Sequence, residues 1–159
     1  MSAVTTILVP LDFSEASHAA LRYACRLADR LQASVHLLHV VEPPVVPSGY
    51  VEVYVPSPEL LERFEEEGRR LLQDALTPDE QAKYHAMLVQ RRGQPATEIL
   101  DYAVGHGRVD LIVMATHGHG GVRRLLLGSV TDRVVRSAPC PVLTLRDPLE
   151  SLRRAGLAA

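Results

Sequence analysis

The sequence predicts an α/β fold, an open sandwich in which helices cover a mostly parallel sheet. Five short apolar or β-branched runs are typical of strands that are buried on both faces. Between them lie segments whose apolar residues repeat at spacings of three and four, as in an amphipathic helix. Strands that alternate with helices favour parallel pairing, because each parallel crossover needs a long connection.

The first two predicted strands enclose a well-marked helix. Residues 5–11 (TTILVPL) form the first strand and residues 33–41 (ASVHLLHVV) the second. Ser14 can cap the helix between them, and Cys25 falls on its apolar face, where it is expected to be buried. The apolar residues at helical spacing are Ala20, Leu21, Ala24, Leu27, Ala28 and Leu31.

The middle of the chain begins with a proline-rich segment. Residues 42–58 contain five prolines, which exclude a helix or a central strand there. Its position after the second strand makes the segment a candidate lid. Ser57 followed by Pro58 predicts a helix start, because serine caps helices and proline fits the first helical position. That helix should reach about residue 76, and Thr77 to Glu80 form a capping box for a short following turn.

The C-terminal half predicts three further strands and two helices. The strands are residues 84–91, 110–115 and 139–146, and the helices are residues 95–104 and a segment from Ser129 to about Ser137. The prediction is a single domain over residues 1–147 with a loosely ordered tail at 148–159.

Composition excludes several classes of function. The net charge of −2 lacks the basic excess of proteins that bind nucleic acid or membrane surfaces. No apolar run approaches the roughly 20 residues of a membrane span. The N-terminus has no basic region of a signal peptide, and Cys25 and Cys140 form no CxxC pair. We therefore expect a cytoplasmic protein with reduced thiols.

In open α/β sheets, ligands bind beyond the carboxyl ends of the strands. Asp12, residues 40–42 and residues 115–121 follow predicted strands and are the positions to consider. The usual nucleotide motifs are absent, since there is no GxxxxGK[ST] and Lys83 is the only lysine. The first turn, PLDFSE, also contains no glycine, which excludes the dinucleotide fingerprint there.

The start of the helix at Ser129 has the features of an anion site. The first amides of a helix lack partners, and the helix dipole adds roughly half a positive charge. Gly128 lets a ligand approach the backbone, and Ser129 and Thr131 add hydroxyl donors. An ordinary Gly-Ser helix cap explains the same residues, and both interpretations stay open at this point.

Three stretches of the chain resemble the universal stress protein family. Residues 113–146 (VMATHGHGGVRRLLLGSVTDRVVRSAPCPVLTLR) are similar to its C-terminal half, and residues 7–28 and 36–42 to its opening and second strand. The ATP-binding branch carries the motif G-x2-G-x9-G-[ST]. Gly118, Gly128 and Ser129 fit this motif, whereas Ala115 replaces its first glycine. That methyl group costs little if the position needs only extended backbone, and weakens binding if glycine is required.

The resemblance implies a Rossmann-like sheet in the order 3-2-1-4-5 with about four helices. It also implies a site for ATP (or AMP or ADP) with Mg²⁺ or Mn²⁺, which Asp12 would meet weakly or through the nucleotide. Asp12 would lie near the ribose with Pro10 beside it, and the backbone of Val40 would meet the adenine edge. Residues implied along the phosphate path are Met114, Ala115, His117, Gly118, Gly128, Ser129, Val130 and Thr131.

The function implied is that of a nucleotide-responsive regulator of stress tolerance. The family pairs its fifth strand across a two-fold axis, which implies a homodimer through Val142, Leu143 and Leu145, since exposed apolar edges seek partners. The sequence shows no nucleophile–base pair and no lysine near the phosphates, so efficient catalysis is disfavoured. Two alternatives stay open. One is a nucleotide-free protein acting by protein contacts, and the other is a slow ATPase or self-phosphorylating protein.

Some candidate residues also have structural interpretations. Asp12 could serve only as a helix cap. His36 and His39 lie on a buried strand, where neighbouring groups are expected to satisfy them. The pair His117 and His119 lacks a third ligand at suitable spacing, so a metal site on the pair is disfavoured.

Overall fold

Five parallel strands form one sheet in the order β3-β2-β1-β4-β5, which confirms the predicted fold class. The computed structural model describes residues 3–42, 57–105, 109–116 and 128–145. The elements are β1 (Thr6–Leu11), α1 (Glu15–Leu31), β2 (Ser34–Val41), α2 (Pro58–Asp74), α3 (Pro78–Lys83), β3 (Met87–Arg92), α4 (Pro95–Gly105), β4 (Leu111–Ala115), α5 (Ser129–Ser137) and β5 (Val142–Leu145). The tail at 148–159 lies outside the described residues, so the domain limits stay a prediction.

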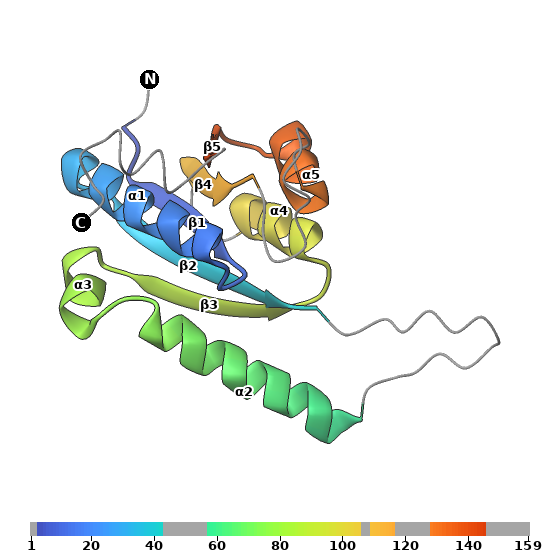
Figure 1. Ribbon diagram of the computed structural model, residues 1–159. Helices are drawn as coiled ribbons and strands as arrows, with labels where there is room; N and C mark the ends of the chain where they lie inside the picture. Colours follow the sequence, from blue (N-terminus) through green and yellow to red (C-terminus); the bar gives the residue numbers. More distant parts are fainter. Residues whose placement is uncertain (1–2, 43–56, 106–108, 117–127, 146–159) are drawn as a thin grey trace.

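Strand β1 occupies the centre of the sheet, between β2 and β4 (Figure 1). It pairs with β2 from Thr6↔Ser34 to Leu11↔His39 and with β4 at Ile7↔Leu111 and Leu8↔Ile112. The chain order therefore reverses between β1 and β4. In this class of fold a reversal of strand order opens a crevice beyond the carboxyl ends of the two strands.

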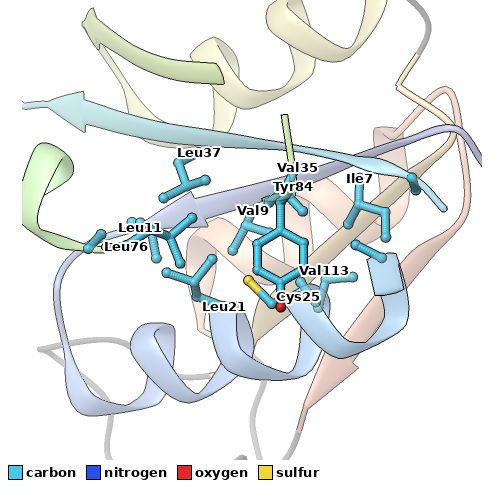
Figure 2. Packing of buried hydrophobic residues seen from close by; sticks show 14 of the residues in the cluster. Ile7, Val9, Leu11, Leu21, Cys25, Val35, Leu37, Leu76, Tyr84 and Val113 are labelled. Carbon is cyan, nitrogen blue, oxygen red and sulfur yellow. The ribbon is translucent and has the colours of Figure 1, made fainter. Parts of the chain in front are cut away.

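Two hydrophobic cores lie on opposite faces of the sheet. Ile7 and Leu8 are adjacent and both fully buried, because successive strand residues point to opposite faces. The face covered by α1 and α2 contains Val9, Leu21, Cys25, Val35, Leu37, Leu72, Leu76, Tyr84 and Val113 (Figure 2). The other face, covered by α4 and α5, contains Leu38, Ile99, Tyr102, Ile112, Met114 and Val134. No described helix combines the length and hydropathy of a membrane span.

The predicted helix starts are confirmed by their capping hydrogen bonds. Ser14 Oγ accepts from the amide of Ser17, and Ser57 Oγ accepts from the amide of Leu60. Thr77 and Glu80 form the predicted reciprocal capping box. The short turn predicted after Thr77 is a six-residue helix, α3. The described residues therefore contain five helices, one more than the four expected.

Two strand boundaries were predicted wrongly. The third strand begins at Met87 rather than 84, because Tyr84 caps α3 and His85 adopts a left-handed backbone with φ of 45°. The Tyr84 ring nevertheless lies in the core, which explains its strand-like appearance in the sequence. The fifth strand begins at Val142 rather than 139. Pro139 and Pro141 precede it and have no amide hydrogen to give to a sheet.

Candidate functional site

A pocket of about 430 Å³ lies at the carboxyl end of the sheet, where the strand order reverses. It contains every predicted site residue within the described part of the chain: Pro10, Asp12, Val40, Met114, Ala115, Gly128, Ser129, Val130 and Thr131. His117 and Gly118 lie outside the described residues, as do residues 43–56 of the candidate lid at 42–58. The volume is within the usual range for small-molecule sites.

The first turn of α5 lines one end of the pocket. Gly128 is the N-cap and makes no side-chain capping bond, and Ser129 is exposed at the first helical position. The amide of Asp132 is the first to bond within the helix, to Gly128 O at 2.8 Å. The amides of residues 129–131 therefore have no acceptor in the helix, which is the arrangement that binds anions.

Two hydrogen bonds join the start of α5 to the end of β4. The Gly128 amide donates to Thr116 O at 2.9 Å, and Thr131 Oγ1 donates to Ala115 O at 3.0 Å. A β-carbon at position 128 would lie 3.2 Å from Thr116 O, so glycine permits this close approach. Thr131 uses its hydroxyl hydrogen in this contact. Its hydroxyl is therefore not the free donor expected from the sequence, and the backbone amide is the Thr131 group left to donate to an anion.

Ala115 occupies a position that does not require glycine for its dihedral angles. It is the last residue of β4 and pairs with Leu145 of β5. Among the described non-glycine residues, positive φ occurs at Phe13, Gln32 and His85 and not at Ala115. If the Ala115 methyl group weakens nucleotide binding, it must do so by contact with the nucleotide and not through backbone strain.

The turn between β1 and α1 presents a carboxylate to the pocket. Asp12 Oδ1 accepts from the amide of Ser14 at 3.0 Å and from Ser14 Oγ at 2.6 Å. Ser14 is the residue that caps α1, so Asp12 supports the cap and does not replace it. Phe13 has a φ of 61°, an uncommon conformation for a residue other than glycine that is often found at functional sites.

The charge of the pocket wall comes from acids and from helix amides. Asp12 and Glu42 are carboxylates, and among the described lining residues there is no lysine or arginine. A phosphate chain in this pocket would be balanced by the amides of α5 and by a cation. One carboxylate combined with phosphate oxygens is a donor set that suits Mg²⁺, a hard cation that prefers oxygen ligands.

The pocket also has an apolar lining. Leu38 and Val40 of β2 and Pro95 and Ile99 of α4 contribute to it. β2 and β4 lie on either side of β1, so their ends are separated by two strand spacings, about 9–10 Å. The pocket thus combines the amide donors of α5 with apolar surface from β2 and α4, and the Asp12 turn follows the strand that lies between β2 and β4.

Several residues of this pocket were given no role from the sequence. Glu42 and Thr116 fall within the stretches 40–42 and 115–121 that follow predicted strands, but they were not named as site residues. Pro95 and Ile99 belong to a helix, and Ser17 is buried in the first turn of α1. Their places depend on how the helices pack, which no local pattern shows.

A sequence profile of the universal stress protein family matches residues 3–146. The chain belongs to this family. The universal stress protein MJ0531 of Methanocaldococcus jannaschii is 35% identical to it over 150 residues, covering 89% of this chain and 82% of the relative. The solved structure of the universal stress protein UspA from Lactobacillus plantarum is 32% identical, with a TM-score of 0.73 and coverage of 92% and 100%.

Two more distant universal stress protein structures contain adenine nucleotides. One is a complex with cAMP, at 22% identity, a TM-score of 0.66 and coverage of 91% and 99%. The other, from Archaeoglobus fulgidus, is a complex with dAMP, at 21% identity, a TM-score of 0.58 and coverage of 91% and 100%. At identities of 21–22%, the similarity of these two structures to the present chain shows that they share its fold.

Proposed function

We propose that this universal stress protein binds an adenine nucleotide, ATP or AMP or ADP, and acts as a nucleotide-responsive regulator of stress tolerance. The observation that carries the proposal is the pocket at the β1/β4 reversal, which combines helix amides that have no acceptor in the helix with an apolar surface. The proposal is also supported by proteins of the same fold whose structures contain cAMP and dAMP.

In this proposal each part of the nucleotide meets matching chemistry. The phosphates lie at the first turn of α5, where the amides of residues 129–131 donate to their oxygens. The adenine lies against the apolar surface beside Val40, and the Asp12 carboxylate lies near the ribose. Asp12 would also meet a Mg²⁺ or Mn²⁺ ion bound to the phosphates, and this ion would offset their negative charge.

The proposal includes little or no efficient catalysis. Within the described residues no hydrogen bond joins the Ser129 hydroxyl to a base, and the Ser14 hydroxyl that bonds to Asp12 is buried as the cap of α1. Slow hydrolysis or self-phosphorylation is the second candidate. It would appear as phosphate release or incorporation that is lost in Asp12→Ala or Ser129→Ala.

We also propose a cytoplasmic homodimer that pairs through β5, the edge strand next to β4. Val142 and Leu143 are half-buried within one chain and can gain contacts in a dimer. Leu145 is 6% exposed, so it packs inside the chain and adds little to such an interface.

Nucleotide binding can be tested with two substitutions at opposite ends of α5. Ser129→Asp places a negative charge where the phosphates are expected, although an acid at a helix N-terminus favours folding by about 0.3–1 kcal/mol. Ser137→Asp adds the same charge about eight residues away, roughly 12 Å along the helix, where it is unfavourable to the dipole.

We expect Ser129→Asp to be the more stable variant but to bind Mg-ATP poorly, and Ser137→Asp to be the less stable variant but to bind normally. At 100 times its dissociation constant, Mg-ATP should stabilise the wild type by about 2.7 kcal/mol, which raises Tm by roughly 5–11 °C for a chain of this size. Ser137→Asp should keep this shift and Ser129→Asp should lose most of it, despite being the more stable variant without ligand. A wild type that carries no adenylate in native mass spectrometry and shows no shift with millimolar Mg-ATP would contradict the proposal.

A further inference from the structure

The side chain of His39 in β2 lies on the face of the sheet covered by α1 and α2, where it meets Gly68 of α2. Its neighbours Leu38 and Val40 line the pocket, and side chains alternate along a strand. Its Nδ1 atom is 2.8 Å from the carbonyl oxygen of Leu11 at the end of β1. Because a carbonyl can only accept, Nδ1 carries the hydrogen and donates it.

The same ring also contacts the residue on the other side of Asp12. The ring centroids of His39 and Phe13 are 4.4 Å apart, with an angle of 42° between the planes. His39 therefore holds the carbonyl that precedes Asp12 and the aromatic ring that follows it. Phe13 has the left-handed φ of 61°, and such a conformation persists only when surrounding contacts impose it.

Helix α2 closes the remaining side of the His39 ring. Gly68 approaches so closely that a β-carbon there would lie 2.8 Å from His39 Cδ2 and 3.0 Å from Nε2. The ring is therefore packed between the β1–α1 turn and α2. Burial lowers the pKa of His39, only partly opposed by the Leu11 carbonyl and the Asp12 charge, which agrees with a neutral ring that has its hydrogen on Nδ1.

We propose that His39 is a positioning residue for the pocket. Through its bond to Leu11 and its contact with Phe13, it sets the backbone on both sides of Asp12 and so places the Asp12 carboxylate. The consequence for binding rests on the proposed function. A cation-bound nucleotide meets the carboxylate through its cation as well as beside its ribose, so it should depend on His39 more than a nucleotide bound without a cation.

Three substitutions separate positioning from simple packing. In asparagine, as in Nδ1 of histidine, the donor nitrogen is bonded to Cγ, so His39→Asn retains a donor for Leu11 O. His39→Gln moves the amide one carbon further, toward the position of Nε2. His39→Leu fills the space and has no donor at all.

The first measurement needs no ligand. The amide of Ser14 donates to Asp12 Oδ1, so its hydrogen exchange reports directly on the turn. We expect NMR to show exchange at least tenfold faster than wild type in His39→Leu and His39→Gln, and within threefold of wild type in His39→Asn. Unchanged exchange at Ser14 in His39→Leu would overturn the positioning role. So would equally fast exchange in His39→Asn and His39→Leu.

The second measurement is calorimetric titration with Mg-ATP and, separately, with AMP in EDTA. His39→Leu should weaken Mg-ATP binding at least tenfold and AMP binding less than threefold, and His39→Asn should restore Mg-ATP binding to within threefold of wild type. Equal weakening of both ligands would overturn the role, because a purely structural defect would affect both alike. If the wild type binds neither ligand, the proposed function fails, and with it the effect of His39 on affinity. The exchange of Ser14 still tests the turn in that case.

Discussion

Replacing Gly68 with alanine would test how closely α2 packs against the His39 ring. The added β-carbon would lie 2.8 Å from His39 Cδ2, whereas ordinary contact begins at 3.4 Å, so helix and ring must separate by 0.6 Å. The ring cannot turn away without losing its 2.8 Å bond to Leu11 O and its contact with Phe13.

Two opposing contributions set the size of the effect. Alanine inside a helix favours folding by about 0.5–1 kcal/mol relative to glycine. Overfilling a buried site costs about 1–3 kcal/mol, because neighbouring groups must shift. Gly68 is buried in the middle of α2, so both contributions apply fully. We expect the free energy of unfolding to fall by about 1 kcal/mol.

Gly105 provides the matched control for this substitution. It is the last residue of α4, and a β-carbon there would meet nothing within 4 Å. Gly105→Ala should therefore show only the favourable contribution, a gain of about 0.5 kcal/mol. Urea unfolding followed by circular dichroism would compare the two variants with wild type. A Gly68→Ala protein as stable as the Gly105→Ala protein would refute the close packing of α2 on His39.

Three further predictions concern pH, the Asp12 charge and the dimer. Burial lowers the pKa of His36 below its ordinary value near 6.5, so on acidification the unfolded chain takes up the proton first. The free energy of unfolding should be at its full value above about pH 6.5 and fall below it, and urea unfolding at pH 7.5 and 5.5 should show a smaller fall in His36→Asn. Asp12→Asn keeps an oxygen for Ser14, so it should cost about 1 kcal/mol of stability or less but reduce the effect of Mg²⁺ on ATP affinity in calorimetry. Leu143→Arg should give a monomer in light scattering, whereas Met87→Arg on the opposite edge strand should stay dimeric. A dimeric Leu143→Arg would exclude the β5 interface.

Much of the fold could be predicted because its signals are local. Ser14, Ser57 and Thr77 cap helices through contacts within three residues, so their spacing in the sequence was sufficient. The start of β3 could not be predicted in this way. Tyr84 is buried like a strand residue, although its backbone belongs to the turn after α3.

The site was predictable to the extent that it follows strand ends. Asp12, Val40 and Ala115 were found because parallel strands bring their carboxyl ends to one edge of the sheet. The contact between Thr131 Oγ1 and Ala115 O joins residues 16 positions apart, and the bond of His39 to Leu11 joins residues 28 apart. Contacts of this kind depend on tertiary packing, which the sequence pattern does not contain.

A crystal structure of this protein with Mg-ATP would test the central claim most directly. We predict phosphate oxygens within hydrogen-bonding distance of the amides of residues 129–131, the adenine beside Val40, and the cation on the side of Asp12. A nucleotide bound elsewhere on the molecule, or phosphates that do not contact the first turn of α5, would contradict it.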